Sequence, residues 1–201
     1  MSKQNSKTQK TGVIVFLMMI SILSFVMSSC NKEDYLQNAG NTENYTQAEA
    51  DSNVPEVPAN LQVPEGNKLS YHVFASGVQI YRCDGTSWVF VAPEATLYAN
   101  SGYNGEVGTH YAGPRWESNS GSIVRGAVDQ SAPSPDPNSV AWLLLHSAEN
   151  SGSGIFADVT YIQRVNTSGG KAPLTGCDPL NIGTEIRVPY TAEYYFYKAE
   201  N

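Results

Sequence analysis

The sequence predicts an all-β domain, a single sandwich or barrel of roughly seven to eight mostly antiparallel strands with little helix. Apolar and polar residues alternate through most of the chain after residue 61, as they do in half-buried strands. The breaks between these runs are rich in Gly, Pro, Asn, Asp and Ser, the residues that favour turns. No segment combines a sustained helical period with capping residues, so little helix is expected.

The first predicted element is a strand over 69–75, where Leu, Tyr, Val and Ala fall on one face and Ser70 and His72 on the other. Two further runs, 78–83 and 88–91, flank a four-residue turn that begins with Asp84 and Gly85. An Asp-Gly pair is suited to the positive φ angles of tight turns. The pattern therefore predicts a β-hairpin at this position.

Further strands are predicted at 122–128, 141–147 and 154–165, where apolar residues again alternate or cluster in short runs. The last strand begins near Glu185 and continues toward the C-terminus. It contains Pro189, which has no backbone N–H to donate to a neighbouring strand. An edge position or a bulge is therefore expected at this proline.

The first 29 residues have the three parts of a secretory signal peptide. A basic stretch ends at Lys10, an apolar run covers 13–27, and two serines precede Cys30. The apolar run of 15 residues is shorter than the roughly 20 that a membrane-spanning helix needs. The Met-Ser-Ser-Cys sequence at 27–30 resembles the lipobox of bacterial lipoproteins, in which the cysteine is lipidated after cleavage before it.

We therefore expect a signal peptide over 1–29 and a lipid anchor on Cys30, with no catalytic role for this cysteine. The lipid would hold the protein in the outer membrane of a Gram-negative cell, on the periplasmic face or on the cell surface. The polar stretch 30–60 contains almost no large aliphatic side chains and is expected to be a disordered tether. The all-β domain would occupy 61–201.

The mature chain would be acidic, with 9 basic against 19 acidic residues once the three lysines of the signal peptide are removed. This balance repels nucleic acid and anionic lipid heads, so no nucleic-acid partner is expected. Two cysteines remain after lipidation of Cys30, and in an oxidising compartment Cys83 and Cys177 are predicted to pair. A reactive thiol is the alternative, although the neighbouring Asp84 and Asp178 would raise the pKa of such a thiol.

From Leu61 to Ala199 the chain resembles an uncharacterised family of exported domains in bacteria and fungi, the DUF3455 family. The stretches that carry the resemblance are 77–83, 88–90, 92–95, 108–117, 142–145, 162–167, 169–170 and 188–192. The resemblance implies the domain boundaries and assigns no activity. Some fungal relatives carry a malate dehydrogenase label, but this chain lacks the Gly-x-Gly-x-x-Gly turn that holds a dinucleotide.

The stretch 110–117, His-Tyr-Ala-Gly-Pro-Arg-Trp-Glu, places an imidazole, a guanidinium, an indole and a carboxylate within eight residues. Loops on a rigid β scaffold often carry function, so this stretch is the first candidate for a pocket. The candidate residues are His110, Trp116 and Glu117, with Arg115, Gln163 and Arg164 as second choices. The alternative is a purely structural role, in which these side chains pack and satisfy buried polar groups.

Other chemistry finds little support in the sequence. The three histidines, His72, His110 and His146, are far apart and form no His-x-His pair, so no metal site is expected. The chain has no Gly-x-Ser-x-Gly motif for a serine nucleophile, and no cofactor is expected.

Two functions therefore remain open. The first is a non-catalytic module that binds a glycan or another small molecule. Sugar rings could stack on aromatic side chains, although core packing is the favoured role of the candidates Trp88, Trp116, Tyr190 and Tyr194.

The second function is a metal-independent hydrolase or lyase. In this reading His110 and Glu117 form an acid–base pair, and Arg115 or Arg164 holds an anionic substrate. A cleft that contains His110, Glu117 and an arginine together would favour the enzyme. Dispersed side chains with buried aromatic residues would favour the binding module or a purely structural role.

Overall fold

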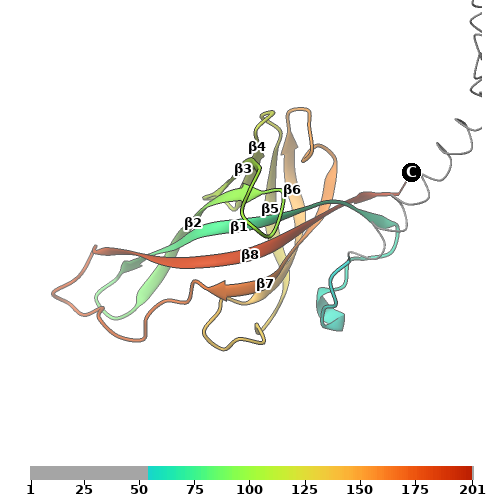
Figure 1. The fold of residues 1–201 in the computed structure, drawn as a ribbon. Coiled ribbons are helices and arrows are strands. Elements are labelled where there is room, and N and C mark those ends of the chain that lie inside the picture. The colour runs from blue at the N-terminus through green and yellow to red at the C-terminus, as the bar shows by residue number, and fades with distance from the viewer. Residues whose placement is uncertain (1–53, 201) are drawn as a thin grey trace, which may run out of the picture. The chain divides into compact units, whose positions relative to one another are not determined.

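Eight strands form one sheet that closes into a barrel (Figure 1). Along each strand the side chains point alternately to the interior and to the outer face. The computed structural model describes residues 54–200, so the predicted signal peptide, Cys30 and most of the tether lie outside the described residues. Each strand pairs antiparallel with the next, and the last pairs with the first. The strands are β1 Asn67–Cys83, β2 Trp88–Tyr98, β3 Glu106–Tyr111, β4 Arg115–Ser118, β5 Ile123–Ala132, β6 Trp142–Ser151, β7 Val159–Gly169 and β8 Glu185–Ala199.

The predicted all-β class and the predicted hairpin are confirmed. Strands β1 and β2 pair up to Cys83 and Trp88, with one register shift next to Tyr81. The turn forms because the Asp84 carboxylate accepts hydrogen bonds from the backbone N–H groups of Thr86 and Ser87, each at 2.8 Å. Gly85 follows Asp84 with a φ of 97°, which a side chain would strain.

The stretch 110–117 forms most of a second hairpin, β3–β4, with its turn at Gly113 and Pro114. One prediction about strand position is wrong. The strand expected over 154–165 begins only at Val159. The residues before it form turns that carry Phe156 into the core, where its side chain is fully buried. A buried aromatic residue in a turn has the same sequence signature as a strand residue, which explains the difference.

Pro189 lies at a local edge of the sheet. It pairs with Val78 of β1, whereas the last pair between β7 and β8 joins Gly169 to Tyr190. The Pro189 carbonyl accepts a hydrogen bond from Gly170, the first residue after β7, at 2.9 Å. Since the N and O atoms of a strand residue point to the same neighbour, the missing N–H lies on the side where β7 has ended.

The barrel core is densely packed toward the end where β2–β3, β4–β5 and β6–β7 connect. Its buried side chains include Phe156, Phe196 and Ile162, all fully buried. Ser122 supports this end, because its Oγ accepts a hydrogen bond from the Phe156 backbone at 3.2 Å. The other end of the barrel is filled less completely, and the candidate site lies there.

A second cluster lies on the outer face of the sheet. The segment before β1 contains the single 3-10 turn η1, Ala59–Leu61, and its Leu61 side chain is fully buried against residues of β5 and β6. The Leu61 carbonyl accepts a hydrogen bond from Gln163 Nε2 at 2.7 Å, and Tyr197 donates to the other side of the same amide at 2.6 Å. Val57 also packs here, so ordered contacts begin a few residues before the expected start of the domain.

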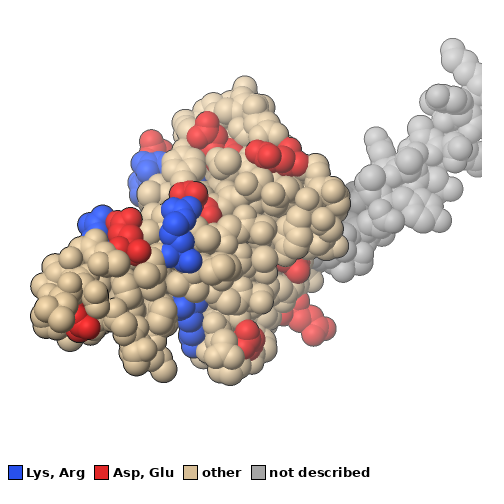
Figure 2. All heavy atoms as spheres, turned by 60° about the vertical axis from the view of Figure 1, so that its left-hand side comes forward, with Lys and Arg blue, Asp and Glu red and all other residues tan. Residues whose placement is uncertain are grey.

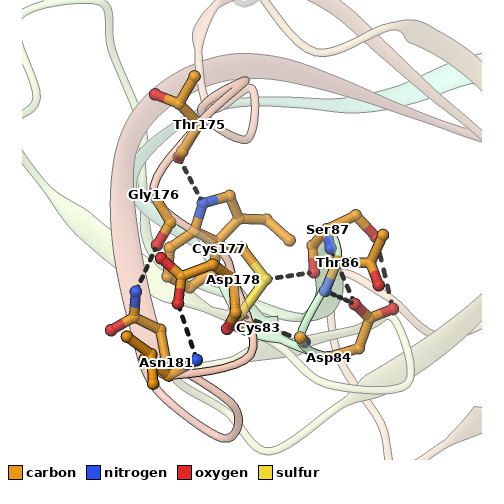
Figure 3. Close-up of a disulfide and its surroundings, with 12 residues drawn as sticks. Cys83, Asp84, Thr86, Ser87, Thr175, Gly176, Cys177, Asp178 and Asn181 are labelled. Carbon is orange, nitrogen blue, oxygen red and sulfur yellow. Dashed lines mark hydrogen bonds between the residues drawn. A yellow bond between two sulfur atoms is a disulfide. The ribbon is translucent and has the colours of Figure 1, made fainter.

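The disulfide between Cys83 and Cys177 is confirmed, with the two Cα atoms 5.3 Å apart (Figure 3). It joins the end of β1 to the long segment between β7 and β8. Trp88 strengthens the same attachment, since its indole N–H donates to the Thr175 carbonyl at 2.9 Å. The segment is therefore held against the β1–β2 turn by a covalent bond and a side-chain hydrogen bond.

Charged side chains on the visible surface lie in small mixed groups separated by wide uncharged areas (Figure 2). Three ion pairs on the outer surface join arginines to glutamates: Arg82–Glu185, Arg125–Glu149 and Arg187–Glu94. Exposed pairs of this kind contribute little to stability. Within residues 54–200, no helix has the length and apolar character needed to cross a membrane.

Candidate functional site

The candidate site is a cavity of about 590 Å³ at the barrel end where the strand pairs β1–β2, β3–β4 and β5–β6 turn. This volume is within the range of sites for small organic molecules. Its walls are mainly apolar, with side chains from β2, β5 and β6 and the segment before β6: Phe90, Val91, Pro93, Val128, Val140 and Leu143. Phe90 and Val128 are 52% and 55% exposed, so apolar surface faces solvent at the mouth.

Three ring systems pack together at the floor of the cavity. His110 of β3 stacks on Trp116 of β4, with ring centroids 4.4 Å apart, because the two residues are direct partners in the hairpin and face the interior. Tyr194 of β8 packs edge-on against Trp116 at 5.2 Å. All three side chains are almost completely buried and separate the cavity from the packed core.

His110 is neutral and its tautomer is fixed. Its Nδ1 lies 2.8 Å from the Arg115 carbonyl oxygen, which can only accept, so Nδ1 carries the proton and Nε2 has none. Burial lowers the pKa of His110 to about 3, the hydrogen bond to Arg115 opposes the shift, and the charge of Arg164 adds to it. The imidazole is therefore an uncharged group at neutral pH.

Arg164 of β7 brings a positive charge to the cavity. Its Nε and Nη2 atoms donate to the Ala141 carbonyl at 3.1 and 2.8 Å. Burial raises the pKa of Tyr194, and the charge of Arg164 opposes that shift. Among residues 54–200, no carboxylate lies within ion-pair distance of Arg164.

Two buried donors of the lining residues have no hydrogen-bond partner within the described chain. They are Gln79 Nε2 of β1 and Trp116 Nε1 of β4. Buried polar atoms in folded proteins are nearly always paired, because an unpaired donor keeps its desolvation penalty. The residues at the cavity floor thus include a cation and two N–H groups that are buried beside the cavity without a well-placed acceptor.

The structure brings together only some of the sequence candidates. His110, Trp116 and Arg164 line the cavity. Glu117 is paired with Thr109 on the opposite face of the β3–β4 hairpin, where it accepts a hydrogen bond from Tyr111 at 2.9 Å.

The other two candidates also lie away from the cavity. Arg115 donates to the Ala112 carbonyl at 3.2 Å, outside the barrel interior. Gln163 binds the Leu61 carbonyl in the outer cluster. The expected acid–base pair of His110 and Glu117 is therefore not formed, because alternate residues of a strand point to opposite faces.

The aromatic residues considered for sugar stacking are mostly internal. Trp116, Tyr190 and Tyr194 are exposed by 3% or less, and Trp88 donates to the Thr175 carbonyl beside the disulfide. The two remaining histidines are separate from each other and from the cavity. His72 contacts Glu193 at 3.0 Å and His146 contacts Asp129 at 2.6 Å.

Sequence reasoning missed several lining residues, above all Gln79 and Tyr81 of β1 and Lys171 after β7. A glutamine among apolar residues of a strand, as at Gln79, is a signal of a buried polar side chain. The face to which Gln79 points could not be assigned before the strand pairing was known. Tyr81 donates to the Gly170 carbonyl at 2.6 Å and so holds the chain after β7 against β1.

The family model described as "Protein of unknown function (DUF3455)" matches residues 64–198. The match covers β1 to β8 and therefore the whole barrel with its cavity. No curated protein and no solved structure matches the chain.

Proposed function

We propose, for a chain that belongs to the DUF3455 family of proteins of unknown function, a non-catalytic role in which the barrel binds a small and largely apolar molecule. The observation that carries this proposal is the cavity itself, an apolar-walled space of about 590 Å³ with a few polar groups at its floor. Small-molecule sites typically combine such walls with a small number of orienting polar groups.

The exposed part of the wall supports the same conclusion. Phe90 and Val128 lie at the mouth and leave about half of their surface in water, although they are large apolar residues. A ligand that covers them would remove this surface from water and gain about 25 cal/mol for each Å² of apolar area buried.

The arrangement gives less support to an enzyme or to sugar binding. Catalysis by the expected pair would need His110 and Glu117 on one substrate, but they lie on opposite faces of the β3–β4 hairpin. A sugar would need partners for many hydroxyl groups, and the lining is mainly aliphatic and aromatic. The aromatic residues Tyr190 and Tyr194 pack inside the barrel instead of lying open at its surface.

The cellular setting of this proposal comes from the sequence. The apolar run that ends before Cys30 supports export, cleavage and lipidation, and the polar stretch after it supports a tether. The barrel would then bind its ligand outside the cytoplasm at the outer membrane. The Cys83–Cys177 disulfide fits an oxidising compartment.

Thermal unfolding of the full chain with a panel of small molecules tests this function. Apolar compounds, neutral and acidic, should raise the unfolding midpoint, by roughly 5 to 10 °C at a concentration one hundred times Kd. Mono- and oligosaccharides should leave the midpoint unchanged.

Two tryptophan variants locate the effect. Leu143→Trp fills the cavity and should abolish the shift, whereas Val89→Trp, on an exposed position of β2 outside the cavity, should retain it. If no apolar compound raises the midpoint, or if the shift persists in Leu143→Trp, the proposed function is wrong.

A further inference from the structure

We infer that the molecule bound in this cavity carries a carboxylate on an otherwise apolar body, with the carboxylate against Arg164 and the apolar part along the wall toward the mouth. This inference rests on the proposed function and names the chemical class of its ligand. It follows from an imbalance between donors and acceptors at the cavity floor.

The charges of the lining are of one sign. Among the described residues that line the cavity, Arg164 and Lys171 are positively charged and none is an aspartate or a glutamate. Lys171 uses its ammonium group on the Pro137 carbonyl near the surface. Arg164 is the cation at the floor. Among residues 54–200, the outer arginines Arg82, Arg125 and Arg187 each have a glutamate partner, whereas no ion pair joins Arg164 to a carboxylate.

The hydrogen bonds of Arg164 leave part of its donors unused, although the guanidinium also lies within reach of the Tyr194 hydroxyl. A guanidinium has five N–H groups, and the bonds from Nε and Nη2 both end on the Ala141 carbonyl. A neutral carbonyl does not balance the charge, and partly buried cations in proteins are usually paired with an anion. An anionic ligand group would supply the missing partner and could accept two parallel hydrogen bonds from the guanidinium.

The other polar atoms of the floor point to the same chemistry. Within residues 54–200, Gln79 Nε2 and Trp116 Nε1 have no well-placed acceptor, although the Gln79 side chain lies near the Tyr190 hydroxyl. Both atoms are buried in residues that line the cavity, so a ligand group that only accepts would satisfy them after a small movement of these side chains. The acceptor that His110 contributes, Nε2, belongs to an uncharged ring and does not repel an anion strongly. A cationic head group would be repelled by the charge of Arg164. A head group that mainly donates hydrogen bonds would leave the N–H groups of Gln79 and Trp116 unsatisfied.

The apolar wall of the cavity determines the chemical character of the rest of the ligand. Phe90, Val91 and Val128 line the cavity and are the exposed apolar residues of its mouth. A carboxylate placed at the floor therefore leaves the rest of the ligand against apolar side chains, which favours an aliphatic or aromatic acid over a polyanion or a sugar acid.

A matched pair of probes tests the head group. Radiolabelled octanoate and 1-octanol are titrated at neutral pH into the full chain held in zwitterionic lipid vesicles, with protein-free vesicles as the blank. Partition into the lipid is the same for every variant, so differences between variants report on the cavity. Octanoate should bind about tenfold or more tightly than octanol, as expected for charge-assisted hydrogen bonds.

Variants assign this preference to the floor. Arg164→Gln should reduce octanoate affinity about tenfold or more and leave octanol binding within a factor of two or so. Gln79→Leu should weaken octanoate binding several-fold, and Arg125→Gln, which removes an arginine from the outer surface, should change neither. Far-UV circular dichroism checks the fold of each variant.

The outcomes separate this inference from the proposed function. Octylamine serves as a cationic probe of the same chain length. Equal affinities of the wild-type chain for octanoate and octanol, or tighter binding of octylamine, would refute the proposed carboxylate and would still be consistent with an apolar binding site. Binding of none of these probes, together with no thermal shift from any apolar compound, would overturn both. The wild-type comparison decides the matter even if Arg164→Gln fails to fold.

Discussion

The imidazole of His110 lies parallel to the indole of Trp116 at the cavity floor, with planes inclined by 13° and Nδ1 bonded to the Arg115 carbonyl. The stack joins β3 to β4 through side chains, beside the backbone bonds of the hairpin. One histidine therefore both closes the packed core and forms the base of the cavity.

Replacement of His110 by alanine should destabilise the fold. It would leave the Arg115 carbonyl without its donor and a gap beneath Trp116, and an unsatisfied buried acceptor alone costs roughly 1 to 3 kcal/mol. Urea unfolding at pH 7 measures the change in the free energy of unfolding. A loss below about 0.5 kcal/mol would contradict the structural role of the imidazole.

The free energy of unfolding should depend on pH through the same residue. The pKa of His110 is about 3 in the folded chain against 6.5 for an ordinary histidine, so between these values the unfolded chain binds a proton that the folded chain does not. The free energy of unfolding therefore does not depend on His110 titration above pH 6.5. It decreases as the pH falls from 6.5 toward 3, at most by about 1.4 kcal/mol for each pH unit.

The variant His110→Asn keeps an N–H donor for the Arg115 carbonyl and removes the titrating ring. Its unfolding free energy should fall less steeply than that of the wild type between pH 6.5 and 5, a window above the titration of ordinary carboxyl groups. Between pH 7 and 8, residue 110 should cause no change in the free energy of unfolding of either protein. Identical slopes in the lower window would show that His110 does not titrate as described.

Loss of the disulfide should lower the stability of the barrel. Cys83 and Cys177 are 94 positions apart, and the chain-entropy model gives an upper figure of about 4.7 kcal/mol for a loop of this length. The double variant Cys83→Ser, Cys177→Ser should therefore unfold at a lower temperature. Non-reducing peptide mapping of the wild type should recover the two cysteine peptides joined, and quantitative alkylation of both thiols without reduction would refute the bond.

A methyl group at Gly77 should disrupt the pairing of β1 and β2. A Cβ atom at this position would lie 2.1 Å from the Glu94 carbonyl oxygen, which belongs to the backbone and has little freedom to move. Gly77→Ala should lower the free energy of unfolding by roughly 1 to 3 kcal/mol or prevent folding. Ser76→Ala on the same strand is the control, and an equal effect of the two substitutions would contradict the close approach.

The proposed anchor can be tested apart from the barrel. Cys30→Ser removes the thiol that would carry the lipid, so the variant should incorporate no labelled fatty acid and should retain residues 1–29. Metabolic labelling and the mass of the purified chain measure both effects. Equal fatty-acid label in the wild type and the variant would refute lipidation at Cys30.

The fold class was predictable because alternation is a local property of a strand. The hairpin around Asp84 and Gly85 was predictable for the same reason, since its turn chemistry lies within four residues. Closure was not, because nothing in the local pattern of β1 says that Asn67 would pair with Ala199 near the other end of the chain. Phe156 was misplaced because a turn residue that fills the barrel resembles a strand residue in sequence.

The candidate site was predictable only in part. Neighbouring residues of a strand point to opposite faces, and the sequence does not say which of them points inward. His110 and Trp116 face the cavity together because the turn at Gly113 makes them direct partners, and the same register sends Glu117 outward. Gln163 and Arg164 are neighbours and must point to opposite faces, but the sequence does not say which one is internal. Gln79 joins the site beside its partner Pro93 of β2, and the sequence did not show that this pair faces the interior.

The pairing of β1 with β8 also affects how copies of the chain meet one another. Each of the eight described strands has a neighbour on both sides, so none is a free edge along its whole length to which a second chain could add a strand. Copies held by the proposed lipid anchor would share one membrane plane at high local concentration, where a free edge strand would promote aggregation. Closure of the sheet removes that edge and so lowers this risk.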